Sequence, residues 1–456
     1  MTALGQVPID DQHEFVMFNG YASSSSCGYC KGRSTRTSER FNYYSHATSI
    51  SPEFYQKLIN RCWRRSGTLI YRPNQRSMCC PHYTIRTDTK TFAIKKDQRQ
   101  VINKFNKFIL GEQFITEEAR LNPRSKAEAK KRDNEFVLTE RIHEAERDRL
   151  KTASTPAHTL VVTLEKDHFT EEKFEVYNNY QMVVHKDEPD SRTKDGFKQF
   201  LCNSPIRRGT VVDDDGRKRK VGSFHQCYRI DGKLVAIGVL DLLPDCVSSV
   251  YFLYHESIHK HAPGKLAALR ELAFAEEEGY RWWYPGYYIH DCPKMKYKAD
   301  YQPLGMLDPV SLKWNALDST TLKLLDKKSF VSLSLESQST PPADEDDDLI
   351  APSAPPIAKP SETTTGGASD SDSDFASQSL FESNMPGITS LEEFADIDLD
   401  HIAVRLRRAP RLFQLCDLVD WESSDVSDGT SLKSLVAEMV AAMGPDCIDD
   451  ICLDLA

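Results

Sequence analysis

The feature that most constrains the fold is an alternation of apolar segments in the middle of the chain. The pattern predicts two strands, a third strand, a helix and a fourth strand, over residues 222–229, 233–243, 248–254, 266–278 and 282–289. Asp231-Gly232, between the first two strands, is a dipeptide typical of β-hairpin turns. Gly279 marks the end of the helix. This order predicts an α+β fold with a mixed sheet and argues against a regular doubly wound sheet.

Composition divides the chain of 456 residues, which is too long for one compact core, into five segments. The first is cysteine-rich and is predicted to form a small α/β domain. A charged, helical connector leads to the third segment, which holds the strands described above. The fourth is an acidic, Ser- and Pro-rich linker predicted to be disordered, and the fifth is predicted to form amphipathic helices at 397–418 and 432–443. The segments are 15–113, 114–155, 156–330, 331–390 and 391–456.

The net charge of −10 conceals two parts of opposite sign. Residues 331–456 hold 26 Asp and Glu against 6 Lys and Arg, whereas residues 1–330 hold 42 against 52. A basic body can attract a polyanion such as RNA. Solvated surface lysines are the alternative explanation of the same excess.

The sequence has no apolar run of about 18 residues, the length that a membrane-spanning helix needs. Its first residues lack the basic stretch and apolar core of a signal peptide. We therefore expect a protein of the cytoplasm or nucleus that does not bind a membrane. In these compartments the 12 cysteines are expected to be thiols, metal ligands or reactive groups rather than disulfides.

Four cysteines form a pattern suited to a metal. Cys27 and Cys30 lie three positions apart, and the adjacent pair Cys79-Cys80 follows in the same segment. Four thiolates could hold zinc or an iron–sulfur cluster, and the spacing does not choose between them. The alternatives are incidental loop thiols with a buried pair, or redox sensing by the adjacent thiols. Five other cysteines are expected to be small buried side chains: Cys62, Cys202, Cys227, Cys246 and Cys292.

A series of motifs resembles the eukaryotic arginyltransferase family over roughly residues 20–315. The N-terminal motifs are CGYC, WRRSG, YRP, CCPHYTIR and KDQR, at 27–30, 63–67, 71–73, 79–86 and 96–99. The later motifs include GVLDLLP, SSVY, GYYIH and KMKYK, at 238–244, 248–251, 286–290 and 294–298. Two positions depart from the family pattern: His255-Glu256 replaces an Asp-Pro, and residues 261–265 replace a Ser-Leu-Gly turn.

The resemblance implies an arginyltransferase that moves arginine from arginyl-tRNA to the α-amino group of proteins beginning with Asp, Glu or oxidised Cys. Such a product would be marked for ubiquitin-dependent degradation as an N-degron. The implied fold of the catalytic domain, 156–330, is acetyltransferase-like (GNAT-like). Its substrates would meet where strands 250–254 and 282–289 splay apart. No Gly-rich GxG turn of a coenzyme A site is present, so no nucleotide cofactor is expected. The sequence does not indicate an oligomeric state.

Candidate site residues follow from the motifs. Asp241, Tyr287 and His290 are predicted catalytic groups, although a strand-end cap and sheet aromatics are the alternatives. The predicted substrate-binding residues are Arg72, which would read the acceptor's acid, Lys296, Lys298, Arg99 and Gly264. The predicted metal ligands are Cys27, Cys30, Cys79 and Cys80.

Two other functions remain open at this point. A coenzyme A-dependent N-acyltransferase would share the same fold and would turn over an acyl-CoA. A non-catalytic, metal-dependent RNA-binding protein would bind tRNA without forming a covalent product.

Overall fold

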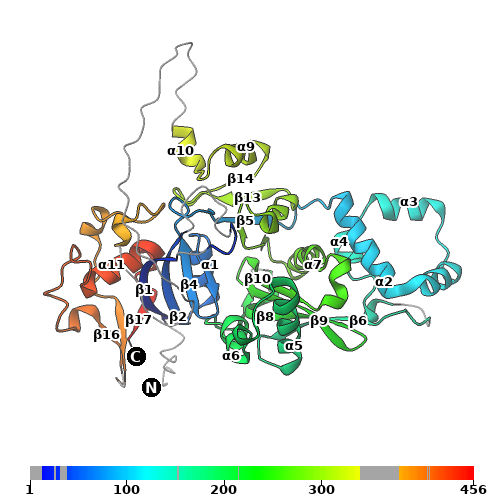
Figure 1. The fold of residues 1–456 in the computed structure, drawn as a ribbon, viewed down its shortest axis with the longest axis horizontal. Coiled ribbons are helices and arrows are strands. Elements are labelled where there is room, and N and C mark those ends of the chain that lie inside the picture. Colours follow the sequence, from blue (N-terminus) through cyan, green and yellow to red (C-terminus); the bar gives the residue numbers. More distant parts are fainter. Residues whose placement is uncertain are drawn as a thin grey trace, which may run out of the picture.

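Two mixed sheets with helices against them carry the fold, as Figure 1 shows. The α+β class with mixed sheets is thus confirmed. In this computed structural model no helix of the described part is long and apolar enough to cross a membrane. The structure describes residues 13–24, 27–30, 39–150, 154–213, 215–338, 379–407, 409 and 411–455.

The first sheet joins segments from both ends of the described chain. Its strand order is β16-β15-β17-β1-β2-β4-β3. β1 and β17 pair in parallel, so the C-terminal segment completes the sheet that the N-terminal segment begins. Helices α1 and α11 contribute to the core beside this sheet, which includes the fully buried Trp63 and Trp421. The strands are β1 (Glu14–Ser24), β2 (Arg40–Ser49), β3 (Arg64–Ser66), β4 (Leu69–Pro73), β15 (Ala403–Leu406), β16 (Phe413–Gln414) and β17 (Ile451–Leu455), and the helices are α1 (Pro52–Ile59) and α11 (Leu432–Met443).

One of the two C-terminal helix predictions is wrong. Residues 397–418 form β15, β16 and the short helix η10 (Leu415–Asp417) instead of one amphipathic helix. Ala403 pairs with Cys452 of β17, so pairing with a distant strand overrides the local helical pattern. The helix predicted at 432–443 is confirmed as α11.

The second sheet has the strand order β14-β13-β5-β11-β10-β9-β8-β6, with β12 on β5 and β7 on β8. The predicted hairpin is present: β8 and β9 pair antiparallel around Asp231 and Gly232, whose φ angles are 54° and 80°. α7 (Pro263–Glu278) connects β10 to the parallel strand β11 and ends at Gly279. The strands are β5 (Tyr83–Asp88), β6 (Leu160–Lys166), β7 (Gly209–Val212), β8 (Lys218–Ile230), β9 (Lys233–Leu242), β10 (Cys246–Tyr254), β11 (Trp282–Tyr284), β12 (Tyr287–Tyr288), β13 (Leu304–Leu307) and β14 (Trp314–Ala316).

The remaining helices lie around the second sheet and in the connector. The connector is helical only in part: it holds the end of α2, then α3, α4 and a short turn at Arg147–Arg149, and it forms an arm at the right of Figure 1. Gly111, with a φ of 78°, interrupts its longest helix. Residues at both ends of the linker predicted to be disordered are ordered, since Val331 and Leu380 are fully buried, whereas 339–378 lie outside the described residues. The helices are α2 (Lys96–Leu121), α3 (Lys126–Asn134), α4 (Leu138–Arg141), α5 (Glu171–Tyr180), α6 (Lys194–Phe197), α8 (Pro293–Lys296), α9 (Ser319–Lys327) and α10 (Leu333–Gln338).

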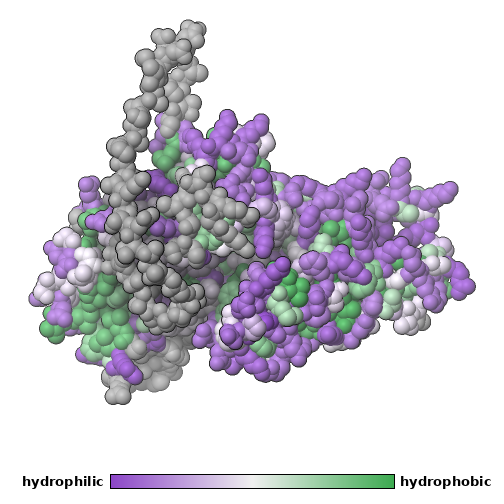
Figure 2. Space-filling view, viewed as in Figure 1, coloured by the Kyte–Doolittle hydropathy of each residue, from purple (hydrophilic) through white to green (hydrophobic). Residues whose placement is uncertain are grey.

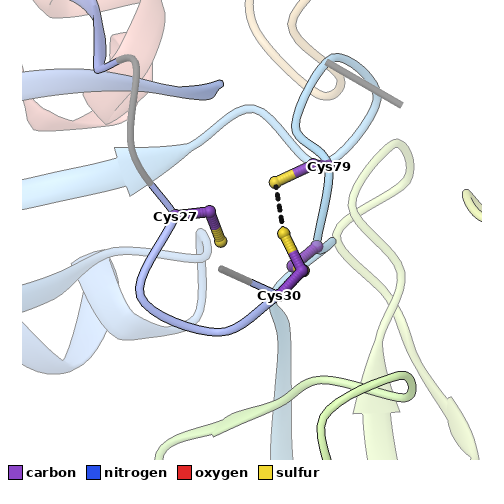
Figure 3. A group of neighbouring side chains, drawn as sticks. Cys27, Cys30 and Cys79 are labelled. Atoms are coloured by element: carbon purple, nitrogen blue, oxygen red, sulfur yellow. Dashed lines mark hydrogen bonds between the residues drawn. The ribbon is translucent and has the colours of Figure 1, made fainter. Parts of the chain in front are cut away.

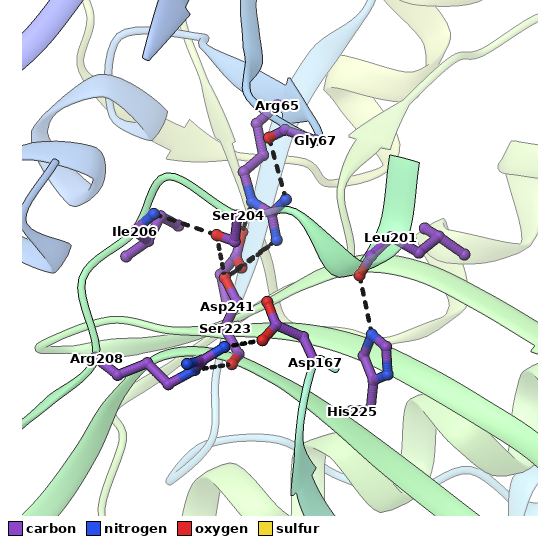
Figure 4. Close-up of polar contacts among 10 residues, drawn as sticks. All are labelled: Arg65, Gly67, Asp167, Leu201, Ser204, Ile206, Arg208, Ser223, His225 and Asp241. Carbon is purple, nitrogen blue, oxygen red and sulfur yellow. Dashed lines mark hydrogen bonds and ion pairs between the residues drawn. The ribbon is translucent and has the colours of Figure 1, made fainter. Parts of the chain in front are cut away.

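A buried ion pair ties the two sheets together (Figure 4). Arg65 of β3 donates from Nε and Nη2 to the two carboxylate oxygens of Asp241 on β9, at 2.8 and 2.7 Å. Ser223 of β8 donates to the same carboxylate at 2.5 Å. The chain passes this junction closely: a Cβ on Gly67 would lie 2.0 Å from the carbonyl oxygen of Gln199.

Breaking this pair is expected to destabilise the protein. Asp241→Asn leaves the Arg65 charge buried and unpaired, and Arg65→Met does the same to Asp241, so each should lower the free energy of unfolding by about 3–5 kcal/mol. Chemical denaturation measures the loss. Lys57→Met is the control, because the Lys57–Asp450 pair is 47% and 40% exposed and should contribute about 0–1 kcal/mol. A loss at Asp241 no larger than that of the control would contradict the expectation.

Candidate functional site

The four predicted metal ligands lie together, and Figure 3 shows three of them, Cys27, Cys30 and Cys79. Cys27 and Cys30 lie on the turn that follows β1, and Cys79 and Cys80 precede β5. Their Sγ atoms all lie within 4.8 Å of one another, and the Sγ atoms of Cys30 and Cys79 are 3.7 Å apart. None of the cysteines forms a disulfide in the described part of the chain.

This cysteine cluster has the dimensions of a metal site. Four sulfurs placed about 2.3 Å from one tetrahedral zinc ion would be about 3.8 Å from each other, close to the distance between Cys30 and Cys79. Burial and the neighbouring thiols raise the pKa of Cys79 to about 12 and that of Cys80 further above its ordinary value. A bound cation would replace the protons of these thiols. The donor set therefore fits a metal that the chemistry of cysteine favours, zinc or iron.

A second feature lies where two parallel strands part. β10 and β11 pair from Cys246 with Trp282 as far as Ser248 with Tyr284. Beyond these positions β10 continues beside β9, whereas β12 pairs with β5. Gly286, with a φ of 82°, lies at the turn between β11 and β12. The single aromatic strand predicted over 282–289 is thus two short strands, and the sheet opens next to them.

Lys298 lies in this strand opening. Its side chain is 8% exposed, and its Nζ donates to the carbonyl oxygen of Tyr287 at 2.9 Å. A Cβ added to Gly286 would lie 3.5 Å from this Nζ and 3.7 Å from the carbonyl oxygen of Ser249, so Nζ stands between the parted strands. Burial and the charge of Arg64 lower the pKa of Lys298 to about 7, against the opposing effect of Glu271. Its amine is therefore partly neutral near pH 7.

Glu271 faces the same opening from α7, and sequence reasoning missed it. The side chain is 2% exposed and accepts a hydrogen bond from Nε1 of Trp283 at 2.9 Å. Burial raises the pKa of Glu271 to about 7, while hydrogen bonds from Trp283 and Ser249 oppose the rise. The available signal was a charged residue within the apolar helical stretch 266–275. An acid and a base whose pKa values are both brought near 7 at one place are a common mark of a catalytic site.

The three predicted catalytic residues have structural partners. Asp241 is fully buried and its two oxygens are engaged by Arg65 and Ser223. The Tyr287 hydroxyl donates to the carbonyl oxygen of Cys62 at 2.6 Å. His290 lies between the Tyr288 hydroxyl, 2.7 Å from Nδ1, and Asp326, 2.8 Å from Nε2. These contacts favour positioning roles for the three residues.

The predicted substrate-binding residues are dispersed. Arg72 is 1% exposed and donates to the carbonyl oxygens of Ala442, Pro386 and Gly387, so it holds the C-terminal segment against the first sheet. Burial lowers the pKa of Arg72 to about 10. Lys296 is exposed on α8, near the buried Lys298.

Two further predicted contacts lie on helices. Arg99 of α2 is half-buried, with its guanidinium 5.5 Å from the ring centroid of Phe136. Gly264 is the second residue of α7, and a Cβ there would meet no atom within 4 Å. The substrate roles of both residues stay predictions.

Comparison with known sequences shows where this arrangement belongs. Residues 25–100 match the family model described as "Arginine-tRNA-protein transferase, N terminus", and residues 172–308 match "Arginine-tRNA-protein transferase, C terminus". The chain is 26% identical to arginyl-tRNA–protein transferase 1 of Drosophila melanogaster, over 68% of this chain and 84% of that one. It is 33% identical to arginyl-tRNA–protein transferase 1 of Saccharomyces cerevisiae, over 54% of this chain but only 47% of that one.

More distant similarities also appear. The chain is 23% identical to an aspartate/glutamate leucyltransferase of Helicobacter hepaticus, over 63% of this chain and 90% of that one. Among solved structures, the L-PGS structure from Bacillus licheniformis aligns with a TM-score of 0.26 and 10% identity, over 54% of this chain and 65% of that one. A TM-score this low does not establish a shared fold.

The two family matches and the curated relatives identify an enzyme of the transferase class. Residues 25–100 and 172–308 belong to the arginyl-tRNA–protein transferase family, by the two models that they match.

Loss of one ligand is expected to release the metal. Cys79→Ser or Cys80→Ser should remove most of the metal that the purified protein carries, as measured by elemental analysis, which also distinguishes zinc from iron. Because the thiols must lose protons to bind, the metal should be given up to a chelator more readily at pH 6 than at pH 8. Cys202→Ser, a half-buried cysteine outside the cluster, is the control. Unchanged metal content in both cluster variants would show that these cysteines are not ligands.

Proposed function

We propose that this enzyme transfers arginine from arginyl-tRNA to the α-amino group of proteins that begin with Asp, Glu or oxidised Cys. The products would enter ubiquitin-dependent degradation as N-degrons. The observation that carries the proposal is the placement of Lys298 and Glu271 in the strand opening of a chain from this family. The name of the Helicobacter relative, an aspartate/glutamate leucyltransferase, supports an acidic acceptor.

The chemistry needs little more than placement and proton transfer. The ester of an aminoacyl-tRNA is already activated, so the enzyme need not supply a nucleophile. The acceptor amine attacks the ester carbonyl carbon, and its nitrogen must lose a proton as the new C–N bond forms. Neutral Lys298 is proposed to take this proton and to return it to the tRNA 3′-oxygen as the C–O bond breaks. Glu271 is proposed to change the net charge of the strand opening when its carboxyl group gains or loses a proton.

We also propose that the second sheet has an acetyltransferase-like fold. The support for this fold is the parallel pair of strands β10 and β11, which are connected by α7. The two strands separate after Ser248 and Tyr284. Acyl donor and amine would approach Lys298 from the two sides of this opening.

The tRNA is proposed to lie along the connector arm. The surface over α2, α3 and α4 is largely hydrophilic in Figure 2. Several basic side chains are exposed on these helices, among them Lys104, Lys107 and Lys130. Phosphate contacts of this kind weaken as salt concentration rises.

The four cysteines would hold a metal with a structural role beside this site. Tyr29, between Cys27 and Cys30, packs on His82, with ring centroids 5.0 Å apart, and His82 packs on Tyr287, at 5.2 Å. A metal on the cysteines would therefore hold in place the packed rings of Tyr29, His82 and Tyr287, which lead from the cysteines to the strand opening.

The proposed reaction has a direct test. The purified protein, given radiolabelled arginyl-tRNA and a peptide that begins with Asp, should incorporate label at the peptide's first amine. The same peptide with an acetylated N-terminus is the control and should take up none. Turnover of acetyl-CoA in place of label transfer would identify an N-acyltransferase, and tRNA binding without product would identify a binding protein; either would refute the proposal.

The proton step predicts a pH dependence. Because the pKa of Lys298 is lowered from 10.5 to about 7, the base is neutral above pH 7, and kcat with saturating substrates should rise with pH through about 7. Lys298→Met should remove this limb and lower kcat by about 10²–10⁴-fold. Lys294→Met, an exposed neighbour on α8, is the matched control.

Stability separates this effect from misfolding. The folded protein disfavours the charged form of Lys298, so its stability should fall as pH falls from 10.5 towards 7. Lys298→Met removes that penalty and should melt no lower than the parent at pH 7. A variant that keeps the parent's pH profile would show that Lys298 is not the base.

A further inference from the structure

Arg64 is a buried arginine with spare hydrogen-bonding capacity. Its side chain lies on β3 and the residue is 6% exposed. Nη1 donates to the carbonyl oxygen of Trp63 at 3.0 Å. Within the described part of the chain, Nε and Nη2 have no hydrogen-bond partner. A buried charge in this state is costly unless something pairs with it.

The neighbours of Arg64 are rings rather than acids. Its guanidinium lies 5.3 Å from the ring centroid of Tyr287 and 5.8 Å from that of Tyr284. Such cation–π contacts favour the charge but leave the N–H groups in the plane of the guanidinium free to donate. The site thus holds a positive charge in place with two unused donors.

Other buried arginines of this region show the contrast. Arg65, the next residue of β3, gives its fork to the carboxylate of Asp241. Arg72 gives three hydrogen bonds to backbone carbonyls of the C-terminal segment. Arg72 therefore has little left for the role of acid reader that its motif suggested, whereas Arg64 keeps a free edge.

Arg64 also lies beside the proposed proton acceptor. Tyr287 carries the Arg64 guanidinium on its ring and accepts from Lys298 through its carbonyl oxygen. The charge of Arg64 is one of the causes of the lowered pKa of Lys298. Tyr71, which packs on Tyr287 with ring centroids 6.3 Å apart, is only partly buried, so this cluster of rings reaches the surface.

We propose that Arg64 is the residue that binds the side-chain carboxylate of the acceptor protein's first residue, while the α-amine of the same residue lies at Lys298. A guanidinium edge suits a carboxylate, because two N–H groups can donate to its two oxygens. The inference rests on the proposed function and deepens it, since it assigns the specificity for an acidic first residue to one side chain.

The test compares two peptides that differ only in an Asp or an Asn as first residue. For each, the dissociation constant is measured by fluorescence anisotropy, and kcat and KM are measured in the transfer assay. Arg64→Gln should raise the dissociation constant and KM for the Asp peptide by about 10- to 150-fold, the loss expected for charge-assisted hydrogen bonds. Binding of the Asn peptide should change by no more than about twofold, because it offers no charge.

Two further variants guard against a purely structural effect. Arg64→Lys keeps the charge without the fork and should give a smaller rise in KM for the Asp peptide, with the melting temperature retained. Arg61→Gln removes a nearby arginine that pairs with Asp446 at the surface and should behave as the parent.

The possible outcomes separate cleanly. Equal weakening of both peptides, or an unchanged KM for the Asp peptide in Arg64→Lys and Arg64→Gln, would overturn the assignment. If the unaltered protein transferred no arginine, the proposed function would fail. The peptide-binding comparison would still decide whether Arg64 reads the acid.

Discussion

The arrangement of the two sheets depends on the buried pair formed by Arg65 and Asp241. Neither charge has access to water, so each needs the other, and the pair fixes where β3 stands relative to β9. Successive residues of a strand point to opposite sides. Once Arg65 is directed at Asp241, its neighbour Arg64 is directed at Tyr287 and the strand opening. The structural arginine thereby places the one that is free to bind a ligand.

The cysteine cluster and the strand opening are connected by packed rings. Tyr29, His82 and Tyr287 follow one another in contact, and the last of them adjoins Lys298. A metal at the cysteines would adjoin this row of rings at Tyr29, which lies between Cys27 and Cys30. A metal would influence the reaction by making these packed rings more rigid, because a metal site contributes its binding energy to folding.

Local patterns in the sequence predicted local structure well. The Asp231-Gly232 hairpin, α7 with Gly279 at its end and the four clustered cysteines are each confirmed. Pairings between distant segments could not be predicted. β15 pairs with the distant strand β17, and the buried Arg72 donates to the carbonyl oxygen of Ala442 in the C-terminal segment.

The strand opening was foreseen only in outline. Its two strands follow from the family resemblance, but the pKa shifts at Lys298 and Glu271 arise from burial in three dimensions, which a sequence does not display. Arg64 and Arg65 are adjacent in one motif, and only their opposite directions in the fold distinguish their roles.

The pairing of β1 with β17 has a consequence for how the protein folds. Thr48 of β2 and its partner Asp454 are 406 positions apart, whereas the β8–β9 hairpin needs only a tight turn. Contacts between residues so distant in sequence form slowly. Until they form, the strands of the first sheet that lack a partner expose apolar surface. During synthesis the second sheet can therefore assemble while the first is still missing a central strand. The first sheet is the part for which a chaperone would matter most.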